Sequence, residues 1–290
     1  MLKGLKAVIL ERFSPAAYLP MIIVFSLANG LYFYFAGNFQ FNLSIIIVCI
    51  LVMLSAFFRL RLFDEIKDYE VDLKINPHRP LARGAVQTHE VQLTIWLLIF
   101  FELFVTSLIN KTAFFVHSLA VIYSLLMYKE FFIGRFIRPH LTTYAISHTF
   151  VSVLFGLSTA AIAFKVNSMK EAFSAIGFFL VNWAYFNLFE FSRKTFAKEE
   201  ERANVDTYSS LFKHRGAALL SFSQVVLAII ILHITVRITM WPVYLLSVIY
   251  SGFLAFYFHK PMMKSAKLLR HASGGFIILS YCILIWNFWR

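Results

Sequence analysis

Three aspartates, Asp64, Asp68 and Asp72, follow one another at intervals of four residues. On a helix this spacing places the three carboxylates on one face, about 6 Å apart from one turn to the next. Like charges so close together repel one another unless a cation lies between them. Carboxylate oxygens suit Mg²⁺, which usually keeps several waters and joins one or two carboxylates to the phosphates of a substrate. The spacing therefore predicts Mg²⁺ and a diphosphate ligand; the alternative is a solvated helix end that binds nothing.

The segment that follows the aspartates carries two arginines and two prolines. Residues 76–84 read NPHRPLARG. The prolines exclude a continuing helix and leave Arg79 and Arg83 on a stiff loop that can fold back over the acids. Because one guanidinium group can form two parallel hydrogen bonds with phosphate oxygens, this loop is predicted to clamp a diphosphate. As an ordinary loop it would only carry positive charge.

A second polar segment lies almost half a chain away. Asn187 and Glu190 are three residues apart and share a helix face, so together they could hold one Mg²⁺, with Arg193 and Lys194 directed at phosphate. The alternative is that Glu190 pairs with Arg193 or Lys194 at the end of the helix. The run of three glutamates at residues 199–201 is interpreted as a solvated loop with a neighbouring arginine.

The elements that must position these residues are membrane-spanning helices. The chain is 60% hydrophobic and 14% charged, a balance that a soluble domain of 290 residues could not hide from water. The apolar runs are near 20 residues long and uninterrupted, which is typical of helices and not of a β-barrel. We expect one all-α domain over residues 1–290, a bundle of about nine spans around an apolar central cavity that opens at the cytoplasmic side. The predicted spans are 15–36, 43–63, 91–109, 112–128, 139–164, 171–189, 216–236, 241–259 and 271–289.

The net charge of +12 is explained by topology and not by nucleic acid. With nine alternating spans, most Lys and Arg residues fall on the side of the amino terminus, among them Arg59, which is counted in the loop after the second span. Such a bias predicts a cytoplasmic amino terminus, as in a bacterial inner-membrane protein. Glu102 falls within a span, where an ionisable group is costly, and it is expected to be protonated and hydrogen-bonded to a neighbouring helix.

Residues 64–84 resemble the first signature of the UbiA-type intramembrane prenyltransferases, NxxxDxxxD followed by RPLxxG. The residues that match are Asp68, Asp72, Arg79, Pro80, Leu81 and Gly84. Asp64 stands where that family usually has Asn, a change that keeps an oxygen ligand and adds a charge. In place of the family's second DxxxD motif, this chain has Asn182, Asn187 and Glu190.

The fourth predicted span also resembles the family. Tyr123 and Lys129 are similar to the Tyr and Lys that the family places near the diphosphate, although Glu130 follows where an Arg is usual. An interfacial tyrosine and a lysine whose charged end reaches the membrane surface would explain both residues without a function.

The resemblance implies Mg²⁺-dependent transfer of a prenyl group from a prenyl diphosphate to a lipophilic acceptor, expected to be aromatic, within the membrane. A non-catalytic carrier of prenyl lipids with the same fold is the alternative. The expected metal ligands are Asp64, Asp68, Asp72 and Glu190. The residues expected to bind substrate are Arg79, Arg83, Tyr123, Lys129, Asn187, Arg193 and Lys194. The expected catalytic residues are Asp64, Asp68, Asp72, Arg79 and Lys129.

Overall fold

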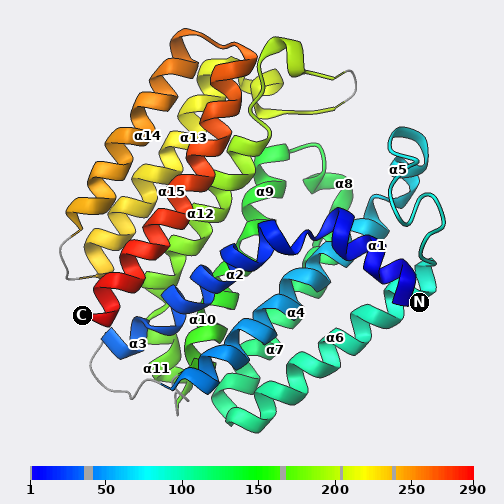
Figure 1. Ribbon diagram of the computed structural model, residues 1–290, viewed down its shortest axis with the longest axis vertical. Coiled ribbons are helices and arrows are strands. Elements are labelled where there is room, and N and C mark those ends of the chain that lie inside the picture. The colour runs from blue at the N-terminus through cyan, green and yellow to red at the C-terminus, as the bar shows by residue number, and fades with distance from the viewer. Residues whose placement is uncertain (1, 36–41, 164–167, 203–204, 237–239) are drawn as a thin grey trace. The chain divides into compact units, whose positions relative to one another are not determined.

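A computed structural model describes residues 2–35, 42–163, 168–202, 205–236 and 240–290. All the regular elements in these residues are helices, as the composition predicts (Figure 1). Contacts divide the chain into two compact units. The first comprises Met1–Phe132 and Ser158–Ala172, and the second comprises Ile133–Leu157 and Phe173–Arg290.

The first unit is built around the long helix α4 (Leu43–Lys67), which packs against α2, α6 and α7. The sequence marks where several of these helices begin. The Asn42 side chain accepts a hydrogen bond from the Ser44 amide, and the Asn110 side chain accepts one from the Ala113 amide. The other helices of the unit are α1 (Leu2–Arg12), α2 (Pro15–Gly30), α3 (Tyr32–Phe35), α5 (Tyr69–Ile75), α6 (Thr88–Ile109), α7 (Lys111–Tyr128) and the short η1 (Glu130–Phe132).

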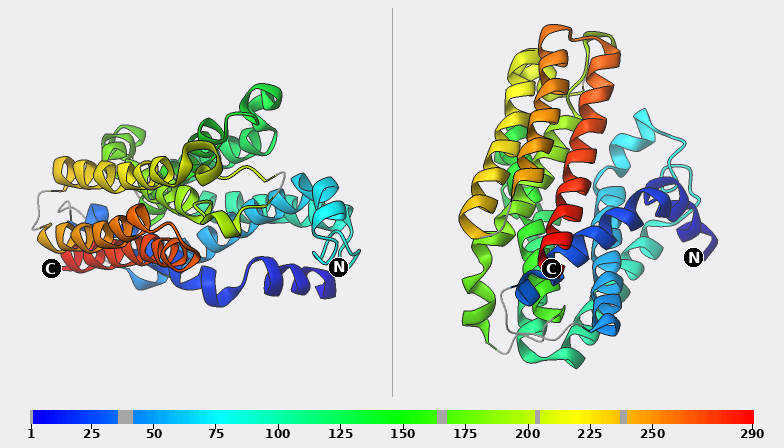
Figure 2. Two further views of the ribbon diagram at one scale, coloured as in Figure 1. Left: turned by 90° about the horizontal axis from the view of Figure 1, so that it is seen from above. Right: turned by 60° about the vertical axis from the view of Figure 1, so that its left-hand side comes forward.

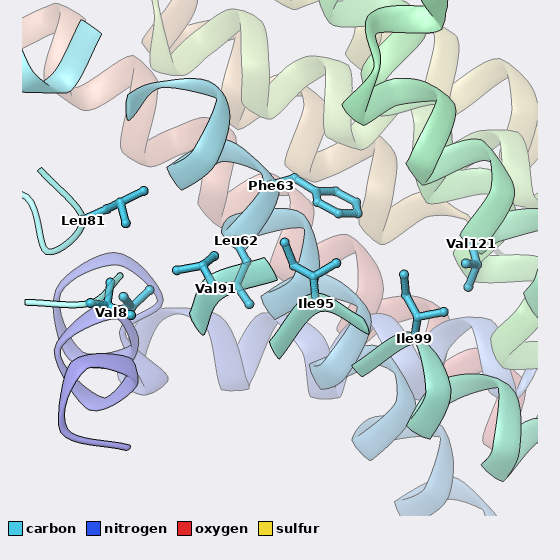
Figure 3. Close-up of a cluster of buried hydrophobic side chains, with 9 residues drawn as sticks. Val8, Leu62, Phe63, Leu81, Val91, Ile95, Ile99 and Val121 are labelled. Atoms are coloured by element: carbon cyan, nitrogen blue, oxygen red, sulfur yellow. The ribbon is translucent and has the colours of Figure 1, made fainter. Parts of the chain in front are cut away.

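A cluster of buried apolar side chains joins α1, α4, α6 and α7 at one end of this unit (Figure 3). Val8 of α1 and Leu62 of α4 are completely buried there, beside Leu81 and Val86 of the loop that follows α5. This cluster fixes the part of the chain in which the aspartates lie.

The second unit is built mainly from four long helices that lie side by side, α12 to α15 (Figures 1 and 2). Its elements are α8 (Gly134–Ile137), α9 (Leu141–Thr149), α12 (Ile176–Arg193), η2 (Lys198–Glu200), α13 (Tyr208–Thr235), α14 (Trp241–His259) and α15 (Met263–Trp289). Two helices have residues in both units, α10 (Val151–Ala163) and α11 (Met169–Ser174).

Eight helical segments of the described residues are long and apolar enough to cross a membrane, and each corresponds to a predicted span. They are Pro15–Phe35, Leu43–Lys67, Thr88–Ile109, Lys111–Tyr128, Leu141–Ala163, Tyr208–Thr235, Trp241–His259 and Met263–Trp289. The remaining predicted span, 171–189, falls on α11 and α12. Helix α12 is 18 residues long, but its apolar character is interrupted by polar side chains, including Asn182, Asn187 and Glu190. That α12 makes a ninth crossing stays a prediction.

Candidate functional site

The three aspartates have the helical spacing that the sequence predicts. No proline or glycine occurs between residues 43 and 75, so the helix continues beyond the apolar run. Asp68 separates α4 from α5, yet its amide donates to the Asp64 carbonyl at 2.9 Å. The Asp72 amide donates in turn to the Asp68 carbonyl at 2.8 Å. The i to i+4 register is thus kept across the break between the two helices.

The three carboxylates nevertheless lie in different surroundings. The side chains of Asp64 and Asp68 are 54% and 52% exposed, whereas that of Asp72 is only 5% exposed. Partial desolvation and the nearby charge of Asp72 raise the pKa of the Asp68 carboxyl, and Arg79 opposes this only in part. The three carboxylates are therefore not equivalent as candidate metal ligands, because they differ in exposure to solvent.

Arg79 folds back over the acids, as the two prolines predict. Its Nη1 lies 2.6 Å from both carboxylate oxygens of Asp72 and 3.9 Å from Oδ2 of Asp68. The Asn76 amide group donates a further hydrogen bond to Asp72 at 3.0 Å. A cation, here a guanidinium group, thus lies close to both carboxylates.

Arg83 pairs elsewhere. It forms two hydrogen bonds with Glu11 of α1, at 2.6 and 2.8 Å, and a third with the His78 carbonyl. Gly84, next in the chain, has φ +74°, a left-handed conformation that an L side chain rarely adopts. The 76–86 loop therefore presents Arg79 to the acids and Arg83 to α1.

The residues around Lys129 form a tight turn at the end of α7. Glu130, Phe131 and Phe132 have φ between +50° and +60°, which costs roughly 1–2 kcal/mol per residue for L side chains. Lys129 Nζ lies 5.2 Å from the centre of the Tyr128 ring, and Tyr123 contacts Phe131 edge-on. Glu130, the residue that departs from the family pattern, lies 3.7 Å from Lys67 at the end of α4.

In the second unit, the candidate residues lie on the last two turns of α12 and are held by neighbouring side chains. Glu190 pairs with Arg193 at 2.5 Å and with Lys194 at 3.4 Å. The buried Asn187 accepts a hydrogen bond from Thr149 at 2.5 Å. Glu190 thus forms the ion pair that its sequence allows at the helix end, and its role as a metal ligand stays a prediction.

The interpretation of residues 199–201 as a solvated loop agrees with the exposed Glu199 but not with Glu200 and Glu201, which are partly buried and paired. Glu200 pairs with Arg270 of α15 at 2.6 Å, and Glu201 accepts hydrogen bonds from Thr207 and Ser209 at the start of α13. These contacts hold the segment after α12 against two other helices of the unit.

Placing Arg59 in a cytoplasmic loop was also wrong, because α4 extends through that position. Arg59 is fully buried and forms a bidentate ion pair with Glu102 of α6, the shortest contact being 2.8 Å. Glu102 thus contacts a neighbouring helix, as expected, but its partner there is the guanidinium group of an arginine. His117 of α7 lies 3.1 Å from Glu102, and Ser158 lies 2.8 Å from the other nitrogen of its ring. The sequence did contain a signal for this ion pair, because Arg59 and Glu102 carry opposite charges and each lies inside an apolar run.

The candidate ligands fit an Mg²⁺ ion that joins the protein to the phosphates of a substrate, and not an ion held by protein ligands alone. Among the described residues, no three His, Cys, Asp or Glu side chains are grouped closely enough to hold a metal ion by themselves. Asp68 and Asp72 supply hard oxygens from one helical face, and one or two such carboxylates suffice when phosphates complete the coordination. Glu190 belongs to the other unit, and its approach to the same ion stays a prediction.

Comparison with solved structures shows the same fold at low sequence identity. One structure, described as giving structural and mechanistic insight into digeranylgeranylglyceryl phosphate synthase in membranes, is 14% identical, with a TM-score of 0.62, and the match covers 98% of this chain and 99% of that one. The other is the apo structure of a UbiA homologue from Aeropyrum pernix K1, 15% identical, with a TM-score of 0.57, covering 89% of this chain and 97% of that one. No curated protein matches the sequence.

A family model matches far more of the chain than the motif from which the resemblance was first inferred. The match runs over residues 21–280 and includes the aspartates, the 76–86 loop, the turn after α7 and helix α12. The chain is an integral membrane protein, and its described residues contain eight apolar helical segments suited to crossing a bilayer. It belongs to the UbiA prenyltransferase family.

Proposed function

We propose that this protein transfers a prenyl group from a prenyl diphosphate to a lipophilic acceptor, expected to be aromatic, within the membrane. The observation that carries the proposal is the group formed by Asp68, Asp72 and Arg79 at the end of a membrane-spanning helix, in a chain of this family. Two carboxylates and a guanidinium group are the side chains needed to bind a metal diphosphate at the membrane surface.

Asp68 and Asp72, assisted by Asp64, would hold Mg²⁺ in the first unit, and Glu190 would contribute from the second. Mg²⁺, when bound, neutralises the diphosphate and stabilises the charge that grows on the leaving group. Arg79 can turn from Asp72 to phosphate as the ion binds, since both interactions use the same guanidinium edge. Glu190 must likewise give up part of its contact with Arg193 and Lys194, which frees these cations for phosphate.

The remaining candidates have supporting roles. Lys129, Arg193 and Lys194 would surround the diphosphate with positive charge, the kind of stabilisation that usually contributes most to such reactions. Arg83 would contact the diphosphate through the N–H groups that Glu11 leaves free. Asn187 and Tyr123 would line the site beside them. An apolar cavity that opens on the cytoplasmic side, where the amino terminus is also proposed to lie, would take the prenyl chain.

The reaction balances without any further reactant. The allylic C–O bond of the donor breaks, and its electron pair leaves with the diphosphate. The allylic carbon then forms a bond with the acceptor, and the proton that the acceptor loses passes to the released diphosphate. Because the surrounding helices are apolar, water is excluded and the acceptor captures the carbon in place of hydrolysis. The acceptor would arrive through the bilayer, which we expect to be a bacterial inner membrane.

A specific observation favours the second candidate, a non-catalytic carrier of prenyl lipids. The polar groups of α12 already have partners, Glu190 with Arg193 and Lys194 and Asn187 with Thr149. If these contacts persist when a donor binds, only one half of the metal site exists, and the protein would bind prenyl diphosphates without reacting.

Purified protein in lipid, incubated with Mg²⁺ and labelled farnesyl or geranylgeranyl diphosphate, separates the two candidates. The enzyme releases diphosphate and labels a lipophilic acceptor from a panel of quinone precursors, porphyrins, glycerol phosphates and sterol-like lipids. Saturable binding with no diphosphate release across the panel would identify the carrier.

A further inference from the structure

Helix α1 lies outside the residues that the family model matches, yet it contacts the proposed donor site directly. The match begins at residue 21, whereas α1 spans Leu2–Arg12. Figure 3 shows Val8 of α1 beside Leu62, Leu81 and Val91, at the end of α4 and next to the 76–86 loop. The amino-terminal helix is thus packed against two segments that carry the predicted donor-binding residues.

The apolar side of this contact is tightly packed. Val8 is completely buried, in one cluster with Leu62 of α4 and with Leu81 and Val86 of the loop. At Gly4 the backbone of α1 runs so close to the loop that a Cβ atom would collide with the Ala85 carbonyl oxygen. Only glycine permits this approach, so the position of α1 on the loop is fixed by shape.

Two consecutive residues of α1 then form ion pairs with the two different segments. Glu11 makes its bidentate pair with Arg83 of the loop, at 2.6 and 2.8 Å. Arg12 Nε lies 2.7 Å from Glu65, a buried residue next to Asp64 on α4, and Arg61 lies 3.0 Å from the same carboxylate. The end of α1 therefore connects the loop to the helix that carries the aspartates.

The chemistry of the pair on the loop side supports a persistent contact. The hydrogen bond from Arg83 lowers the pKa of Glu11, and the pKa of Arg83 is raised for the same reason. Arg83 also donates to the His78 carbonyl, so that its guanidinium group holds the two ends of the 78–83 segment together. Arg79, which contacts Asp68 and Asp72, lies within that segment.

We propose that α1 positions the donor site, with Glu11 and Arg12 fixing the 76–86 loop relative to the carboxylates of α4 so that Arg79 stays between Asp68 and Asp72. This inference rests on the proposed function. Glu11 acts through Arg83 and is a positioning residue that does not touch the substrate. The opposite possibility is that Glu11 competes with the diphosphate for Arg83, and the two ideas predict opposite changes in donor affinity.

Four variants of α1 test the proposal. Glu11→Gln removes the negative charge of the Glu11–Arg83 pair. Val8→Ala weakens the packing of α1 on the loop without changing any charge. Lys6→Gln removes an exposed charge from the same helix and serves as a matched control. We expect Glu11→Gln to raise the KM for the prenyl diphosphate about two- to fivefold, with kcat little changed. This fold-change corresponds to the free energy that a surface ion pair usually contributes. Val8→Ala should raise KM in the same direction, Glu11→Asp should restore part of the loss, and Lys6→Gln should behave as wild type.

A fall in KM for Glu11→Gln would show that Glu11 competes with the donor and would overturn the proposal. An unchanged KM in both Glu11→Gln and Val8→Ala would overturn it as well. A global loss of stability is recognised because it lowers the amount of active protein and leaves the KM of the remainder unchanged.

The proposal can fail separately from the proposed function. Amide hydrogen exchange of residues 79–86 in the substrate-free protein should be faster in Glu11→Gln and Val8→Ala than in wild type and Lys6→Gln. If wild-type protein neither binds nor turns over a prenyl diphosphate, the proposed function is wrong, while exchange still reports whether α1 fixes the loop. Unchanged exchange in both variants would refute the positioning role even in an active enzyme.

Discussion

Asp68 illustrates how a residue suited to binding a cation destabilises the protein when no cation is bound. Partial desolvation and the negative charge of Asp72 raise its pKa above the usual value of a carboxyl group. A raised pKa means that the folded state binds the proton more tightly than the unfolded state. The stabilising contribution is therefore present at pH values below the usual carboxyl pKa and is lost as the pH rises through the raised value.

At neutral pH the ionised Asp68 thus opposes folding, and a neutral isostere should relieve this. We expect Asp68→Asn to raise the melting temperature of the metal-free protein in detergent. Glu70→Gln, which removes an exposed charge from the adjacent helix, serves as the control. A melting temperature that falls in Asp68→Asn but not in Glu70→Gln would contradict the electrostatic account of this residue.

The sequence predicted the spacing of the aspartates and the return of Arg79 toward them, because both follow from local backbone rules: a helix without breakers and a loop with two prolines. It could not predict that Asp72 would be buried and paired while Asp68 stays half exposed. That difference arises from contacts with Asn76, Arg79 and the surrounding loop, which depend on the tertiary fold.

At the scale of elements, α4, α6 and α7 are joined by the buried Arg59, Glu102 and His117. Removing one partner of a buried ion pair leaves an uncompensated charge, which costs about 3–5 kcal/mol. We expect Glu102→Leu and Arg59→Met each to lower the unfolding free energy by this amount. Because two apolar residues of similar size need no partner, the double variant should be more stable than either single variant.

Denaturation of the four proteins in one detergent measures this coupling. Additive losses in the double variant would show that Arg59 and Glu102 do not stabilise the helices as a pair.

The segment after α12 provides a second case, with a pH dependence. Burial would raise the pKa of Glu200, but the hydrogen bonds from Arg270 and the Ala197 amide outweigh it, and the net shift is downward. A lowered pKa contributes stability that is present above the usual carboxyl value of 4.5 and is lost as the pH falls through the lowered value.

We therefore expect Glu200→Gln to lower the unfolding free energy by about 1.5–3 kcal/mol at neutral pH, the range for hydrogen bonds to charged groups. The difference between this variant and wild type should shrink as the pH falls below about 4.5. Glu199→Gln, on an exposed neighbour, should lie close to wild type at every pH. A difference that persists undiminished in acid would rule out ionisation of Glu200 as its cause.

The membrane-spanning helices could be predicted where the length and apolarity of a run alone determine them. For this reason eight predicted spans agree closely with helices of the structure. The errors occurred where a polar residue lies in or beside a span. Arg59 lies within the predicted span 43–63, but its charge was counted with the loop that follows. Its buried position is explained by its contact with Glu102 on another helix. The pairing of Glu200 and Glu201 could not be predicted, because their partners, Arg270 and Thr207, are distant or unremarkable in sequence.

At the scale of the whole molecule, the proposed chemistry requires both units of the chain. Asp68, Asp72 and Arg79 belong to the first unit, and Asn187, Glu190, Arg193 and Lys194 belong to the second. One family model matches both segments. We propose that carboxylates of the two units bind the same metal diphosphate.

The most direct test is the Mg²⁺ dependence of diphosphate release from a labelled prenyl diphosphate, measured for wild type, Asp68→Asn and Glu190→Gln. Glu70→Gln and Glu199→Gln control for the loss of one charge in each unit. We predict that both site variants lose activity by about 100-fold or more, or need far more Mg²⁺, because each removes a carboxylate that would hold the ion against the leaving diphosphate. The two controls should follow wild type. Wild-type activity and Mg²⁺ dependence in either Asp68→Asn or Glu190→Gln would show that the two units do not hold one metal diphosphate between them.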